Sequence, residues 1–160
     1  MKKQQIDIQL EVYENVSELP KEIQELMDKA QQARDSAYAP YSNFKVGAAI
    51  RLSSGEITIG SNQENAAYPS GLCAERVAIF STGALFPNKE IKAMAISASS
   101  PSQILSEPIG PCGACRQSMA EYEQKQKSPI AVYFMGETGK IVKVPKVADL
   151  LPLGFDAKYL

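Results

Sequence analysis

Segments with strand-type and helix-type hydrophobic patterns alternate along most of this 160-residue chain. The first expected helix, for example, places Ile23, Leu26 and Met27 at helical spacing. Strands are expected at residues 6–12, 44–52, 57–62, 91–99, 130–135 and 140–144, and helices at residues 20–35, 73–85 and 112–125. Helices that alternate with strands in this way predict a layered α/β domain.

The length and composition favour one domain that can fold without disulfide or metal cross-links. A chain of this size can bury about 70% of the surface that its unfolded form exposes, and an apolar content of 44% is ordinary for a globular protein. We expect residues 1–20 to form an N-terminal extension and residues 21–160 to form a single domain. No apolar run approaches the roughly 20 residues of a membrane helix. Residues 1–14 lack the apolar segment of a signal peptide, so the sequence predicts a cytoplasmic protein.

The charge of the chain argues against a nucleic-acid partner. Its 17 basic and 18 acidic side chains give a net charge of −1, and no basic stripe stands out. Polynucleotide binding draws much of its affinity from the neutralisation of phosphates. The composition therefore favours a protein that handles small neutral molecules or protein partners.

The three cysteines lie in two short segments, LCAERVAIF and GPCGACRQ, and the chain has no histidine. Both segments follow a loop and begin an expected helix, where free N–H groups and the helix dipole stabilise a thiolate. Cys112 and Cys115 are three residues apart and share a helix face, so Cys73 at a second helix start can complete a three-sulfur zinc site. A redox pair of Cys112 and Cys115 would leave Cys73 unexplained, and core packing suits one free cysteine better than three.

Three sulfur ligands indicate a catalytic zinc site, because structural zinc sites usually have four ligands. Three thiolates leave a formal charge of −1 on the site, and Arg76 is expected to compensate for it from the same helix face as Cys73. Glu75 can reach around the open helix end and move protons to and from a metal-activated water. Taken alone, Glu75 would be an exposed first-turn acid. The structural alternative for Arg76 is a surface arginine in an i,i+3 or i,i+4 pair, and charge compensation is favoured over it.

The Cys-Ala-Glu and Pro-Cys-x-x-Cys segments resemble the signature of the zinc-dependent deaminases. The similarity extends to the small single-domain cytidine deaminases, which have blocks similar to YSNFKVGAAI, GSNQENAAY, CAERVAIF, PCGACRQSMAEY and LLPLGF in this order. It covers roughly residues 21–155. The resemblance implies a three-layer α/β/α sandwich around a mixed sheet of about five strands. It also implies one zinc ion per subunit and a homotetramer with shared active sites.

The resemblance further implies hydrolytic deamination of cytidine and deoxycytidine to uridine and deoxyuridine, with release of ammonia, in pyrimidine salvage. An activated water would attack C4 of the base, and Glu75 would move protons to N3 and to the departing amine. The implied metal ligands are Cys73, Cys112 and Cys115. The implied nucleoside contacts are Asn62 and Glu64 to the ribose, the Ala74 N–H to the C2 carbonyl, Phe44 to the pyrimidine, and Phe155 from a neighbouring subunit.

Each nucleoside contact has a purely structural alternative. Phe44 could be a core residue, Asn62 a turn residue and Phe155 an apolar C-terminal anchor. Two segments depart from the family pattern, Pro69-Ser70-Gly71 ahead of Cys73 and Gly110 ahead of Pro111. The alternatives to cytidine deamination are the deamination of another nucleoside or analogue and a non-catalytic structural zinc module.

Overall fold

A six-stranded mixed sheet forms the centre of the molecule in the computed structural model, which describes residues 1–160 and every side chain except that of Tyr159. The strands lie in the order β1-β6-β5-β4-β2-β3. Their bounds are β1 Glu11–Tyr13, β2 Lys45–Leu52, β3 Ile57–Ser61, β4 Ile91–Ser99, β5 Ala131–Met135 and β6 Ile141–Val144. β4 and β5 are parallel, and the other neighbouring strands are antiparallel.

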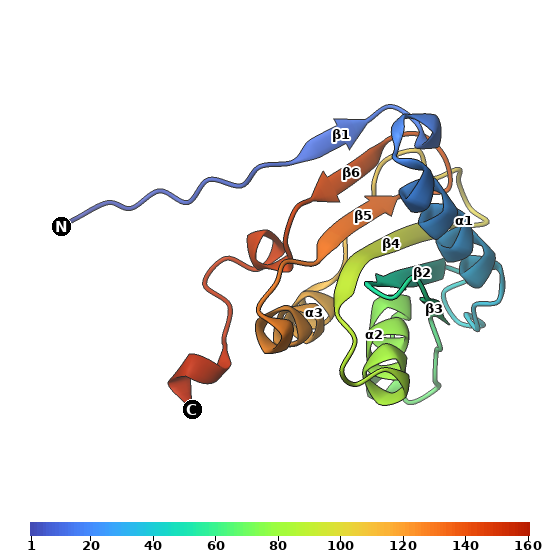
Figure 1. Ribbon diagram of the computed structural model, residues 1–160. Helices are drawn as coiled ribbons and strands as arrows, with labels where there is room; N and C mark the ends of the chain where they lie inside the picture. The colour runs from blue at the N-terminus through green and yellow to red at the C-terminus, as the bar shows by residue number, and fades with distance from the viewer.

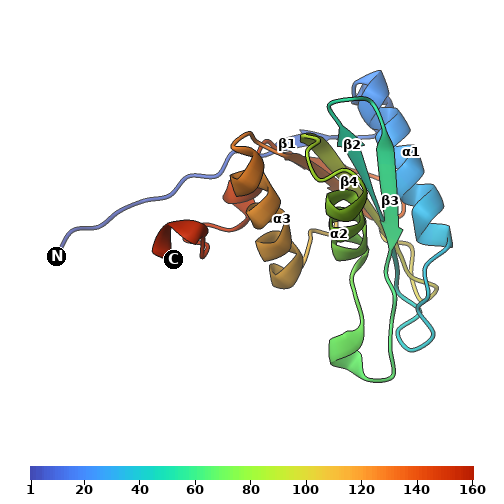
Figure 2. The ribbon, with the colours of Figure 1, turned by 60° about the horizontal axis from the view of Figure 1, so that its bottom comes forward.

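Three α-helices cover the two faces of this sheet (Figure 1). They are α1 Lys21–Asp35, α2 Ala74–Leu85 and α3 Gly113–Gln126. α1 lies on one face, and α2 and α3 lie side by side on the other, which Figure 2 shows from a second direction. The predicted α/β/α sandwich is confirmed. None of the helices in the described part of the chain is long and apolar enough to cross a membrane.

Two apolar clusters hold the layers together, one on each face of the sheet. Ala48, Ile50, Met94 and Ile96 face α2 and α3, whereas the side chains of Ala49 and Ala95 pack against α1. This alternation follows from the period of two along a strand, which sends neighbouring side chains to opposite faces. Because both faces are covered, β2 and β4 are apolar almost throughout, as strands that are buried on both sides are.

The sheet has one strand more than the resemblance implied, and that strand is shorter than its sequence predicted. β1 covers only Glu11–Tyr13 of the strand expected at residues 6–12. Its pairing with β6 sets Glu11 opposite Lys143, so the next residues would meet Val144 and then Pro145. Proline has no N–H to give to a strand ladder, and β6 ends at Val144. Residues 1–10 therefore continue past the body of the molecule without a neighbouring strand (Figure 1).

Candidate metal and nucleoside site

Two helix starts bring the three cysteines together. Cys73 immediately precedes α2, Cys112 immediately precedes α3, and Cys115 lies in the first turn of α3. The two helices are in contact, and Gly83 of α2 leaves room for the Tyr122 side chain of α3. A Cβ added at Gly83 would lie 2.3 Å from the hydroxyl of Tyr122 on α3. The predicted convergence of the cysteines is therefore present in the structure.

The geometry of the sulfur cluster fits a tetrahedral zinc ion. The Sγ atom of Cys112 lies 3.9 Å from that of Cys73 and 3.5 Å from that of Cys115. All three sulfurs lie within 4.8 Å of one another. Tetrahedral zinc with Zn–S bonds of about 2.3 Å requires sulfur–sulfur separations of about 3.8 Å. Among the described residues, no other group of histidine, cysteine or acidic side chains meets the same criterion.

The cluster favours a thiolate at Cys73. A hydrogen bond from the Cys115 thiol, followed in size by one from Arg76, lowers the pKa of Cys73 to about 5. The same hydrogen bond raises the pKa of Cys115, whose side chain is fully buried. Thiolate is the form of cysteine that binds metals.

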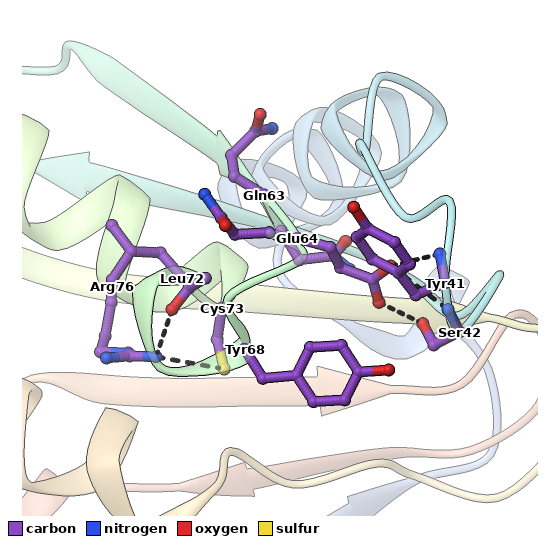
Figure 3. Close-up of a pocket in the computed structure, with 11 residues that line it drawn as sticks. Tyr41, Ser42, Gln63, Glu64, Tyr68, Leu72, Cys73 and Arg76 are labelled. Atoms are coloured by element: carbon purple, nitrogen blue, oxygen red, sulfur yellow. Dashed lines mark hydrogen bonds between the residues drawn. The ribbon is translucent and has the colours of Figure 1, made fainter.

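Arg76 supplies the positive charge beside these sulfurs. Its Nη2 atom lies 3.9 Å from the Cys73 Sγ and donates a hydrogen bond of 3.3 Å to the Gly71 carbonyl (Figure 3). The Nε atom of Arg76 is buried and has no hydrogen-bond partner of its own among the described residues. Arg76 lies three residues after Cys73, the residue that precedes α2, so the charge is held on the sulfur side of the helix.

Glu75 is a buried acid in the first turn of α2, with 4% of its surface exposed. Burial raises the pKa of its carboxyl, and the negative charge of Cys73 raises it further. The carboxyl also interacts with the Cys115 thiol, so it faces the sulfur cluster and not the solvent. The exposed first-turn acid, which was the structural alternative for Glu75, is wrong.

A cavity of about 420 Å³ opens beside Cys73 and Arg76. Its volume lies within the range of about 300–1,000 Å³ that is typical of small-molecule sites. Asn62 and Glu64 line the same cavity, in the segment that follows β3. The sequence-predicted ribose contacts and one sulfur of the cluster thus border one space.

The side chains of Asn62 and Glu64 in the NQEN segment also hold the local backbone. The Asn62 side chain accepts a hydrogen bond from the Val46 N–H (2.8 Å) and donates one to the Phe44 carbonyl (2.9 Å). The Glu64 carboxylate accepts hydrogen bonds from the Tyr41 N–H (2.8 Å), the Ser42 N–H (3.2 Å) and the Ser42 hydroxyl. These hydrogen bonds, that of the Ser42 hydroxyl first, hold the pKa of Glu64 below its ordinary value. Glu64 is therefore a charged acceptor that orders the cavity rim.

The lining of this cavity does not include the other three predicted contacts, Ala74, Phe44 and Phe155. The Ala74 N–H belongs to the first residue of α2, where N–H groups have no partner within the helix. Phe44 is half-buried and does not line the cavity, although Asn62 holds its carbonyl. Phe155 does not line the cavity either. Its side chain is 59% exposed in the C-terminal tail, and its carbonyl accepts a hydrogen bond from Gln117.

Two tyrosines of the cavity wall were missed by the sequence reasoning. Tyr41 and Tyr68 line the cavity, with ring centroids 6.0 Å apart and planes inclined by 57° (Figure 3). Tyr68 begins a short 3-10 turn, Tyr68–Ser70, which overlaps the Pro69-Ser70-Gly71 segment that departs from the family pattern. The two rings come from loops 27 positions apart in the chain, so only the fold reveals that they are neighbours.

Comparisons with known proteins agree with the geometry of the site. The family model described as "Cytidine and deoxycytidylate deaminase zinc-binding region" matches residues 20–131. The cytidine deaminase of Halalkalibacterium halodurans is 40% identical over 138 residues, which are 84% of this chain and 95% of that protein. The cytidine deaminase of Sporosarcina psychrophila is 38% identical over 142 residues, 87% and 95% of the two chains.

Similarity to solved structures extends this result to the fold. The crystal structure of cytidine deaminase from Burkholderia pseudomallei has a TM-score of 0.71 and 41% sequence identity, and the match covers 82% of this chain and 97% of that one. Cytidine deaminase from Mycobacterium leprae has a TM-score of 0.60 at 33% identity, with 80% and 95% covered. With its three convergent cysteines inside the matched region, this chain belongs to the cytidine and deoxycytidylate deaminase family.

Proposed function

We propose that this protein deaminates cytidine and deoxycytidine hydrolytically, with one zinc ion held by Cys73, Cys112 and Cys115. The observation that carries the proposal is the buried Glu75 carboxyl facing a three-sulfur cluster, beside a cavity of nucleoside size. A structural zinc site has no need of an acid in this position. The reaction consumes cytidine and water and yields uridine and ammonia.

When bound, zinc supplies a Lewis acid that lowers the pKa of coordinated water to about 7 in favourable sites. Glu75 then takes a proton from the attacking water and passes it to N3 of the pyrimidine. After the water oxygen has bonded to C4, Glu75 carries the second proton to the amine, which leaves as ammonia. Its burial suits this work, because a carboxyl that is kept from solvent exchanges protons with the reacting groups.

The rest of the site positions the nucleoside. The Ala74 N–H is the donor that we assign to the C2 carbonyl, since it is free at the start of α2. Asn62 and Glu64 are assigned to the ribose hydroxyls, and each keeps further capacity beyond the backbone bonds already described. Phe44 is assigned to the base. Arg76 offsets the negative charge of the three thiolates.

We assign Phe155 to the active site of a neighbouring subunit, in a homotetramer. In its own chain this phenylalanine is largely exposed and lies outside the cavity lining. Leu153 nearby is 92% exposed, and Phe80 and Leu85 leave apolar surface on α2, so the molecule has several faces for association. Light scattering on the purified protein tests the assembly. We place the reaction in pyrimidine salvage in the cytoplasm.

Ammonia release from cytidine by the zinc-loaded protein tests this proposal, with Glu75→Gln as the critical variant. The amide keeps the volume of the carboxyl but cannot take up a proton. We expect the fold and the zinc content to be unchanged and kcat to fall by about 100- to 10,000-fold, the usual contribution of a general acid–base residue. Glu121→Gln on the exposed side of α3 is the matched control and should leave kcat unchanged.

Two results would contradict the proposal in different ways. Turnover that survives Glu75→Gln would remove this residue from the proton transfers. No ammonia from cytidine or deoxycytidine, with a folded and zinc-bound protein, would direct attention to other aminated nucleosides. A protein inactive on all of them would be a structural zinc module.

A further inference from the structure

Residues 1–12 form an arm that lies outside the family-matched region and carries a regular apolar pattern. Residues 1–10 of the arm run away from the body of the molecule as an extension of β1, and residues 11 and 12 belong to β1 itself (Figures 1 and 2). Its alternate residues are aliphatic, and each keeps about half of its side chain exposed: Ile6 52%, Ile8 46%, Leu10 54% and Val12 56%. A period of two is that of a strand with one apolar face, although residues 1–10 pair with no strand of the described chain.

The aliphatic residues of the arm project toward one known side of the sheet. Val12 pairs with Val142 of β6, which packs against the core cluster under α2 and α3. Tyr13, the next residue, packs against the other cluster, on the α1 side. Because side chains alternate along a strand, an arm that continues β1 directs its even-numbered residues to the α2 and α3 side.

The arm continues an open edge of the sheet. β1 is the terminal strand of the sheet and pairs with β6 along one of its edges. The other edge of β1 has no neighbouring strand in the described chain. An open edge with exposed aliphatic side chains is a template for pairing with another strand. No further strand of this chain can continue along residues 6–10, because β6 stops before Pro145.

We propose that the arm pairs antiparallel with the same arm of a second copy of this protein, with Ile8 on the two-fold axis. The sheets of the two copies then join through their β1 edges. In this register Ile6 faces Leu10 of the second copy and Ile8 faces itself. Lys2 faces Glu14 of the second copy. The interaction does not depend on the proposed catalytic function.

The charges of the arm select this register over its neighbours. With Asp7 on the axis, two aspartates would face each other, and like charges directly opposite destabilise a sheet. With Gln9 on the axis, Asp7 would face Glu11. With Ile8 on the axis, Asp7 faces Gln9, Glu11 faces Gln5, and no like charges are opposed. A two-fold axis also means that the same surface of each copy forms the interface, as in most homodimers.

Disulfide trapping in the full-length, zinc-loaded protein tests the register. Ile8→Cys should form a covalent dimer under mild oxidation, because residues directly opposite have Cβ atoms about 4.5–5.5 Å apart. Ile6→Cys is the matched control and should not, because its two copies would lie about 13 Å apart along the strands. An equal mixture of Ile6→Cys and Leu10→Cys proteins should form the covalent dimer again. The unsubstituted protein accounts for any linkage through its own three cysteines.

Sedimentation velocity tests whether the pairing holds copies together without a covalent bond. Ile8→Lys sets two lysines opposite each other. It should raise the dissociation constant of the contact between the paired arms by at least tenfold. Gln9→Lys sets a lysine opposite Asp7 and should not weaken the assembly. Covalent dimers that form equally well with Ile6→Cys would overturn the register. The absence of a dimer with Ile8→Cys, or an assembly indifferent to Ile8→Lys, would overturn the proposal itself.

Discussion

Gly60 of β3 couples the sheet to the site through a close contact with the backbone of α2. The strand lies against the first turns of α2, with no side chain between the two backbones. A Cβ built on Gly60 would lie 2.5 Å from the Ala78 nitrogen and 2.6 Å from the Ala74 oxygen, whereas ordinary contact begins at 3.4 Å. Both atoms belong to the helix backbone, so no side-chain rotation can relieve the contact.

Gly60→Ala must therefore move α2 by about 0.9 Å. Such overpacking typically costs about 1–3 kcal/mol of unfolding free energy. For a chain of this length, each kcal/mol lowers the melting temperature by roughly 2–4 °C. The shift also moves Cys73 and Glu75 relative to Cys112 and Cys115, which α3 holds in place. A misplacement of about 1 Å in a catalytic site can cost about 100-fold in rate, so kcat should fall more than the loss of stability alone would explain.

Thermal unfolding, zinc content and ammonia release at saturating cytidine measure the three effects of Gly60→Ala. Gly110→Ala is the matched control, since a Cβ there would meet its neighbours at 3.7–3.8 Å, which is ordinary contact. We expect the control to melt within about 1–2 °C of the unsubstituted protein, as substitutions that create no clash do. If Gly60→Ala also melts there and turns over at the normal rate, the reasoning from backbone contact is refuted.

Three further perturbations follow from the same structure. Removal of zinc by a chelator should lower the melting temperature, because an ion present at 1,000 times its Kd contributes about 4 kcal/mol to the folded state; calorimetry with and without added zinc measures it. Glu123→Gln should cost about 2–4 kcal/mol in urea unfolding, since this carboxylate accepts three backbone N–H groups, and exposed Glu121→Gln should cost almost nothing. Glu64→Gln should raise KM for cytidine about tenfold with little change in kcat, because an amide offers one acceptor atom to a rim that now uses both carboxylate oxygens. The folded-state pKa of Glu64 lies below its ordinary value, so the contribution of its carboxylate to the stability of the parent protein is complete at neutral pH. That contribution should be lost as the pH falls through the lowered pKa.

Local chemistry made much of the fold predictable from the sequence. The strand expected at residues 91–99 is β4 to the residue, because an unbroken apolar run suits a strand that is covered on both faces. Each of the three α-helices begins within one residue of its expected start, marked by a proline or by a loop that ends at a cysteine. The convergence of Cys73 with Cys112 and Cys115 was also predictable from local chemistry, because three thiols at two helix starts are suited to bind one metal ion.

The rest depended on neighbours that no local pattern reveals. Residues 6–10 have the pattern of a strand, but β6 ends at Val144 and gives them nothing to pair with. The parallel pairing of β4 with β5 is decided by the path of the chain between them, through α3. Tyr41 and Tyr68 meet because two loops converge at the same rim, and neither loop has a pattern that names the other.

Asn62 shows how a sequence can suggest two roles for one residue. As a turn residue it would satisfy the local backbone, and as a family residue it would hold the ribose. Its side chain bonds both the Val46 N–H and the Phe44 carbonyl, so it fixes the start of β2 while it lines the cavity beside Cys73. Asn62→Ala should therefore lower the unfolding free energy by about 1–3 kcal/mol, the cost of leaving part-buried backbone groups unpaired, and also raise KM. Urea unfolding and steady-state kinetics on one preparation separate the two effects. A higher KM at unchanged stability would mean that Asn62 serves the ribose alone, and that water replaces its two backbone bonds at no cost.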